Sequence, residues 1–125
     1  MNRYDPDQAP KPEQWLALDE QTRILLIEDY HRTLSVELPS LQSHAILHAT
    51  IETQIAENIT PVVRAMTRLR REELSRHDAL HAVATVLVEH MCDLSKAKVD
   101  QDNPNAAYYA ALDRFTAKKW FDRYG

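Results

Sequence analysis

Glycine is almost absent from this chain of 125 residues, because the only one is the last residue. Antiparallel sheets joined by tight hairpins depend on turn residues that accept a positive φ angle, and glycine is the usual choice. Helices connected through Asn, Ser, Thr and Pro do not need it. The sequence therefore predicts an all-α fold.

Candidate caps and proline breaks divide the chain into about five helices. Prolines at positions 6, 10 and 12 predict an extended leader over residues 1–14. Helices are expected over about residues 18–34, 41–58, 61–74, 76–96 and 104–120, with N-caps at Asp19, Ser40, Thr60, Ser75 and Asn103. Short connections are typical of a compact bundle, which we expect to form a single helical domain over residues 15–125.

The charge balance and the cysteine content restrict the partners and the compartment. A formal net charge of −4 provides no overall positive field, so we expect no membrane partner and do not favour nucleic acid. The single cysteine, Cys92, allows no internal disulfide, indicates a reducing compartment and is expected to be an inert buried thiol. The first residues lack the apolar core of a signal peptide. We therefore expect a cytoplasmic protein.

The most specific chemical feature is a repeated His-x3-His motif. His44 and His48 lie in the second predicted helix, and His77 and His81 lie in the fourth. Residues four apart share one face of a helix, and both pairs fall on an apolar stripe when positions are counted round the helix. The first stripe continues through Ile51 and Ile55, and the second through Ala84, Val88, Met91 and Cys92. His90 falls on the other side of its helix and is expected at the surface.

Inward-facing histidines need partners, because an unsatisfied buried polar group costs on the order of 1–3 kcal/mol. We expect the second and fourth helices to face each other, so that His44, His48, His77 and His81 converge on one divalent ion. Neutral imidazole is the commonest side-chain metal ligand, and zinc, nickel and iron all accept it. Zinc is the leading candidate. Glu52 is expected to be a fifth ligand or to orient a histidine, and His31 with Glu28 to complete or flank the site.

Two alternatives to a metal site are left open. In the first, the histidines form a metal-free hydrogen-bonded network inside an interaction protein. In the second, the arginine-rich segment between Arg64 and Arg76 belongs to a helical regulator that binds nucleic acid, although a solvated basic face explains this segment better. Aromatic residues of the last helix could either pack inside or form the surface of a homodimer. Binding is favoured over catalysis, and no reaction is assigned.

Three stretches resemble small bacterial proteins of unknown function: "WLALDEQTRILLIEDYH", "LPSLQSHAILHATIETQIAE" and "LSRHDALHAVATVLVEH". Their signature is H-x3-H-x3-E-x-Q, followed later in the chain by R-H-x3-H. The resemblance covers roughly residues 15–95. The matching positions are His31, His44, His48, Glu52, Gln54, Arg76, His77 and His81. It implies an uncharacterised helical domain, without an activity, substrate or cofactor.

Overall fold

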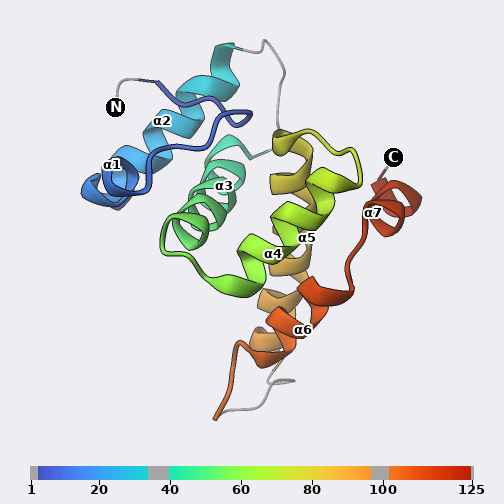
Figure 1. The fold of residues 1–125 in the computed structure, drawn as a ribbon. Coiled ribbons are helices and arrows are strands. Elements are labelled where there is room, and N and C mark those ends of the chain that lie inside the picture. Colours follow the sequence, from blue (N-terminus) through green and yellow to red (C-terminus); the bar gives the residue numbers. More distant parts are fainter. Residues whose placement is uncertain (1–2, 34–39, 97–101, 125) are drawn as a thin grey trace. The chain divides into compact units, whose positions relative to one another are not determined.

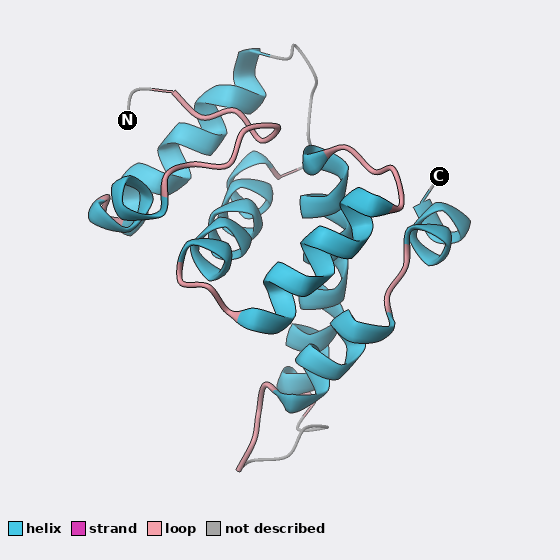
Figure 2. Cartoon of the chain, in the orientation of Figure 1, coloured by secondary structure: helices cyan, strands magenta, loops and turns pink. Residues whose placement is uncertain are grey.

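The computed structural model describes residues 3–33, 40–96 and 102–124. All regular structure within these ranges is helical, as Figures 1 and 2 show, and this confirms the predicted all-α class. The described residues form seven helices where about five were expected, because a short helix precedes the first and the last is two helices. The chain divides into two compact units, Met1–Ile59 and Thr60–Gly125. The single domain expected over residues 15–125 stays a prediction.

The first unit contains α1 (Pro12–Ala17), α2 (Glu20–Thr33) and α3 (Leu41–Ala56). α3 packs against both of the other helices. α1 begins inside the predicted extended leader, because Pro12 fits the first turn of a helix, where no N–H is required. The core includes Trp15, Ile27 and Ile51, all fully buried. The indole N–H of Trp15 donates to Thr53 Oγ1 at 3.1 Å, which satisfies the one polar atom of the largest core side chain.

Arg23 on α2 connects all three helices of this unit. Its Nε and Nη2 atoms donate to the carbonyl oxygens of Trp15 and Leu16, each at 3.1 Å. These carbonyls belong to the end of α1, where the last turn of a helix leaves its oxygens without intrahelical partners. The Nη1 atom also donates to Thr53 Oγ1 on α3 at 3.3 Å. One guanidinium therefore caps α1 and fixes it to the other two helices.

The predicted N-caps of three helices are confirmed, including that of α5 (Arg76–Ser95) in the second unit. In each case the capping side chain accepts the backbone N–H of the residue three positions later, the pattern of a helix N-cap. The bonds run from Thr22 to Asp19 at 2.7 Å, from Ser43 to Ser40 at 3.4 Å and from Asp78 to Ser75 at 3.0 Å. The hydrogen bonds from Thr22 lower the pKa of Asp19 below its usual value.

Two helices end at residues in the left-handed conformation that are not glycine. Asn58 follows α3 with a φ of 57°, and Glu73 follows α4 (Thr60–Arg71) with a φ of 75°. The N–H of the next residue, Ile59 or Leu74, then bonds back to a carbonyl five residues earlier, at 2.9 and 3.2 Å respectively. This is the Schellman ending of a helix. Asn accepts this conformation readily, whereas Glu is held there against the steric preference of its Cβ.

We expect Glu73→Gly to raise the free energy of unfolding by roughly 0.5–1 kcal/mol, because removing the Cβ strain outweighs the added freedom of glycine in the unfolded chain. Glu73 is exposed, so little packing is lost. Urea denaturation would measure the change. Glu73→Ala, which keeps the Cβ, is the matched control. A glycine variant no more stable than the alanine variant would show that position 73 is not strained.

The second unit contains α4, α5, α6 (Ala106–Arg114) and α7 (Ala117–Tyr124). Within it, α4, α5 and α6 contact one another pairwise. The buried residues of α5 include Leu80, Val83, Leu87 and His90. His90 is only 6% exposed, although the sequence predicted it at the surface. Conversely, Met91 is 52% exposed and Cys92 is exposed, although both were predicted to face the core. The predictions were wrong because apolar residues lie nearly all round α5, so periodicity does not determine which face packs.

The expected last helix is interrupted because side chains at the end of α4 and just after it bind the backbone at the break. Arg68 donates to the carbonyl of Phe115 from Nη2 at 2.7 Å and from Nε at 3.1 Å, and also to the carbonyl of Leu112. Glu72 Oε1 accepts the N–H of Ala117 at 2.7 Å. A cation therefore meets the C-terminal end of α6, and a carboxylate meets the N-terminal end of α7. Both placements match the charge preferences of helix ends.

The caps of the last two helices differ from the prediction. Thr116 Oγ1 accepts the N–H of Lys119 at 3.2 Å, which starts a new helix in the middle of the expected one. α6 begins after Asn105, and not at Pro104 with Asn103 as its cap. The side chain of Asn105 makes no capping hydrogen bond, so this start depends on the packing of α6 against α4 and α5.

Candidate metal centre

Three of the predicted site histidines come together in the first unit. His31 lies near the end of α2, and His44 and His48 lie one turn apart on α3. One ring nitrogen of each lies within 4.8 Å of those of the other two. The ring centroids are 4.5 Å apart for His31 and His44, 4.7 Å for His44 and His48, and 5.1 Å for His31 and His48. The sequence placed His31 only as completing or flanking the predicted site, whereas the structure brings it as close to His44 and His48 as they are to each other.

The packing of α2 on α3 places these three rings, hereafter the histidine cluster, in a largely buried position. His31 is 4% exposed and His48 is 1% exposed, while His44 is half-buried. The fully buried Ile27 and Ile51 lie on the same two helices, four residues before His31 and three after His48. Such burial restricts the access of water to the ring nitrogens.

A backbone hydrogen bond sets the tautomer of His31. Its Nδ1 lies 2.8 Å from the carbonyl oxygen of Ile27, one turn earlier on α2. A carbonyl oxygen can only accept, so Nδ1 carries the proton and Nε2 carries the lone pair in the neutral ring. Histidines that bind metals commonly donate their second nitrogen to a backbone carbonyl in this way. The ring of His31 is therefore held in the form that a metal ligand requires.

The spacing of the cluster fits a small divalent ion after modest side-chain adjustment. A tetrahedral zinc ion with Zn–N bonds of about 2.0–2.1 Å holds its nitrogens about 3.3 Å apart. The three nitrogens, within 4.8 Å of one another, can reach that spacing by small rotations of the rings. Three neutral nitrogen ligands suit zinc, nickel, cobalt and iron, and they leave a coordination position for a further ligand.

Glu52 lies one turn after His48 on α3 and is 1% exposed. Its Oε2 atom accepts a hydrogen bond from the hydroxyl of Tyr4, 48 residues earlier in the chain. A buried carboxylate is costly unless it is hydrogen-bonded, and Tyr4 provides such a bond. The ring of Tyr4 also lies 6.5 Å from that of His48, centroid to centroid. The predicted role of Glu52 as a metal ligand stays a prediction.

Two further residues of α2 lie near His31 in the chain: Tyr30, which was not predicted as a ligand, and Glu28, which was expected to complete or flank the site. Tyr30 packs edge-on against His31, with ring centroids 5.3 Å apart. Burial, followed by the nearby carboxylates of Asp5 and Asp7, raises the pKa of Tyr30. Glu28 is 9% exposed and lies three residues before His31, so α2 carries a Glu-x-x-His spacing on one face. Bundles that bind two iron ions use this spacing together with further carboxylates.

The other predicted histidines lie in the second unit. His77 and His81 occupy the first two turns of α5 with ring centroids 4.4 Å apart, so they share a helix face as predicted. Their convergence with His44 and His48 stays a prediction. His90 stacks on Tyr108, with centroids 5.4 Å apart and 23° between the rings. Its buried Nε2 has no hydrogen-bond partner among the described residues.

Three arginines of α4 form hydrogen bonds or ion pairs within the second unit. Arg64 forms an exposed ion pair with Asp113 at 3.1 Å, and the half-buried Arg68 binds the carbonyls at the end of α6. Arg70 donates to the carbonyl of Leu74 at 3.0 Å. The predicted solvated basic face is therefore wrong for Arg68, whose guanidinium is part of the packing. Nucleic-acid binding by this segment gains no support from these contacts.

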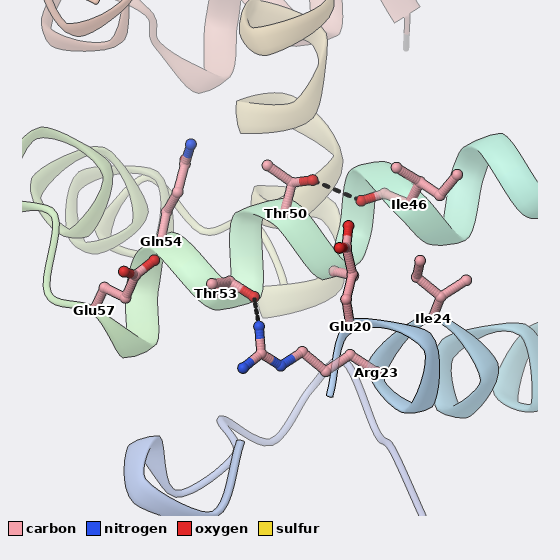
Figure 3. A pocket seen from close by; sticks show the side chains of 9 residues that line it. Glu20, Arg23, Ile24, Ile46, Thr50, Thr53, Gln54 and Glu57 are labelled. Carbon is pink, nitrogen blue, oxygen red and sulfur yellow. Dashed lines mark hydrogen bonds between the residues drawn. The ribbon is translucent and has the colours of Figure 1, made fainter. Parts of the chain in front are cut away.

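A cleft of about 340 Å³ lies between α2 and α3 on the first unit. Figure 3 shows Glu20 and Arg23 on one wall, and Thr50 and Thr53 on the other. The hydroxyl of Thr50 donates to a backbone carbonyl of its own helix, and Thr53 accepts from Arg23. The bond of Thr50 lies within α3, the bond from Arg23 joins α2 to α3, and no histidine lines the cleft. It therefore does not compete with the cluster as the candidate site.

No protein-family model, curated protein or solved structure matches this chain. The resemblance of residues 15–95 to a bacterial family of unknown function therefore stays an expectation. Among the helices in the described ranges, none combines the length and the apolar composition that crossing a membrane requires.

Proposed function

We propose that the first unit binds a divalent metal ion through His31, His44 and His48, with zinc as the leading candidate. The observation that carries this proposal is the approach of three ring nitrogens, from two helices, to within 4.8 Å of one another. The tautomer of His31 supports it, because Nε2 offers a lone pair toward an ion. His31 and His48 are almost fully buried, which shields their ring nitrogens from water and so favours binding of an ion over hydration.

The three nitrogens leave at least one position of a four-coordinate ion for another ligand. The sequence predicts Glu52, His77 and His81 as candidates for this further ligand. A fourth protein ligand would close the shell and make the ion structural or sensory, whereas a bound water would make hydrolytic chemistry possible with Glu52 as base. We favour binding over catalysis, because the cluster is largely buried.

The test is the metal content of tag-free protein purified without a nickel column, measured by mass spectrometry. Wild type should carry close to one ion per chain, and His31→Ala and His48→Ala should carry almost none, since each loses one of three ligands. His90→Ala is the matched control, because His90 is also buried but stacks on Tyr108 in the other unit. Glu52→Gln and His81→Ala identify the further ligand.

A metal-free wild-type protein that also fails to bind added Zn²⁺ in calorimetry would contradict the proposal. The metal-free interaction protein would then be the better explanation, with the histidines as hydrogen-bonding residues of the core.

A further inference from the structure

A second cavity on the first unit has a volume of about 580 Å³. It is lined by residues 3–5 and 8–11, by Gln14 and by Tyr30, and none of these is a histidine. The cavity is larger than the cleft of about 340 Å³ between α2 and α3. Pockets that hold small organic ligands have volumes of about 300–1,000 Å³, so this cavity is large enough for such a ligand.

The segment over residues 3–11, which provides most of the lining, is firmly packed. Tyr4 belongs to the hydrophobic core of the unit, and Pro6 is fully buried. Between them and α1 the chain makes a turn, in which the N–H of Gln8 donates to the carbonyl of Asp5 at 3.0 Å. A wall held in this way keeps the cavity formed before a ligand arrives, as is usual for small-molecule sites.

Two tyrosines form the aromatic part of the lining. The rings of Tyr4 and Tyr30 meet edge to face, with centroids 6.2 Å apart and 90° between their planes. The hydroxyl of Tyr4 is bonded to Glu52, so this residue lines the cavity with its ring. Burial, followed by the carboxylates of Asp5 and Asp7, raises the pKa of the half-buried Tyr30, so its hydroxyl remains protonated. The two rings suit a ligand with a flat aromatic body.

The charged residues in the lining are two cations and one carboxylate. The side chains of Arg3 and Lys11 form no hydrogen bond or ion pair with other residues that the structure describes. The carboxylate of Asp5 is partly engaged, since its Oδ1 accepts the N–H of Asp7 at 2.9 Å. The lining therefore carries an excess of positive charge in a chain whose formal net charge is −4. Arginine and lysine beside a cavity suit a carboxylate or phosphate group of a ligand.

We infer that this cavity binds a small aromatic anion. The ring of the ligand rests against Tyr4 and Tyr30, and its phosphate or carboxylate contacts Arg3 and Lys11. The amide of Gln14, which lines the same cavity, offers both a donor and an acceptor to any further polar group of the ligand. This site is separate from the proposed metal centre and does not depend on it.

The experiment titrates the isotope-labelled full-length protein with four small probes and follows its backbone amides by two-dimensional NMR. Phenyl phosphate and benzoate carry a ring and an anionic group, benzylamine carries a ring and a cation, and inorganic phosphate has no ring. The two aromatic anions should bind roughly tenfold more tightly than the other two probes, because only they match both parts of the lining. The tighter of the two identifies the anionic group that the site prefers.

Three variants locate the binding. Arg3→Gln combined with Lys11→Gln removes both cations and should weaken binding of phenyl phosphate roughly tenfold. The matched control, Arg71→Gln combined with Lys96→Gln, removes the same charge from exposed positions of the second unit and should leave the affinity unchanged. Ala9→Trp places a bulky side chain at an exposed lining position, so it should abolish binding of both aromatic anions with little change in melting temperature.

His44→Ala, which removes a proposed metal ligand, should bind phenyl phosphate as wild type does, because no histidine lines the cavity. Loss of binding in this variant, while circular dichroism shows its helices intact, would assign the anion to the metal ion and overturn the inference. Equal binding of benzoate and benzylamine, or full affinity without Arg3 and Lys11, would also overturn it. Failure of the metal proposal is recognised separately, because the wild-type protein would then bind no Zn²⁺.

Discussion

Saturating Zn²⁺ is expected to stabilise the wild-type protein by about 3–4 kcal/mol when free zinc exceeds the dissociation constant by about a hundred- to a thousandfold. An ion that binds only the folded state shifts the unfolding equilibrium by mass action, and this site exists only when α2 and α3 pack together. Circular dichroism melts with and without zinc would measure the shift. His48→Ala is expected to abolish it, and His90→Ala to keep it.

The zinc-induced stabilisation should also depend on pH in a defined direction. Only neutral imidazole binds the ion, so protons compete with zinc at lower pH. With three such ligands the stabilisation should weaken progressively as the pH is lowered. A shift that survives at the lower pH would indicate carboxylate ligands such as Glu28 or Glu52, and would contradict a centre built on imidazoles alone.

Substitution of Arg68 is expected to destabilise the second unit strongly. Arg68→Met keeps the length of the side chain but leaves the carbonyls of Leu112 and Phe115 without their charged donor. Hydrogen bonds from charged groups are worth more than neutral ones, and two acceptors lose theirs, so the free energy of unfolding should fall by about 3 kcal/mol. Urea denaturation followed by circular dichroism would measure the loss.

Arg64 provides the matched control for this experiment, since it lies one turn earlier on the same helix. Its ion pair with Asp113 is exposed, with side chains 55% and 46% accessible, and such pairs contribute little. Arg64→Met should therefore cost less than about 1 kcal/mol. Equal effects of the two substitutions would mean that the contacts of Arg68 at the end of α6 do not stabilise the unit.

The fold class and the starts of three helices could be predicted from the sequence because they depend on local chemistry. The scarcity of glycine, and the caps Asp19, Ser40 and Ser75, act within a few residues, and a single sequence records such effects directly. The break after α6 could not be predicted. It depends on Arg68 and Glu72, which lie more than 40 residues away from the backbone groups that they bind.

Only the part of the candidate site that depends on local spacing could be predicted from the sequence. The i, i+4 spacing shows that His44 and His48 share a face, and this is local information. That His31 joins them depends on the packing of α2 against α3, and the position of Tyr4 depends on a contact across 48 residues. The orientation of α5 was misjudged because both of its sides are apolar, and the burial of His90 depends on α6.

The packing around Trp15 gives the protein a built-in optical probe. Its ring lies 5.8 Å from that of Tyr4, and the chain has only one other tryptophan, Trp120, which belongs to the second unit. In a Trp120→Phe background, fluorescence would come from one indole, which is fully buried and lies beside Tyr4. Emission wavelength and quenching by iodide would then report the burial of Trp15, and with it the packing of the first unit, without any added label.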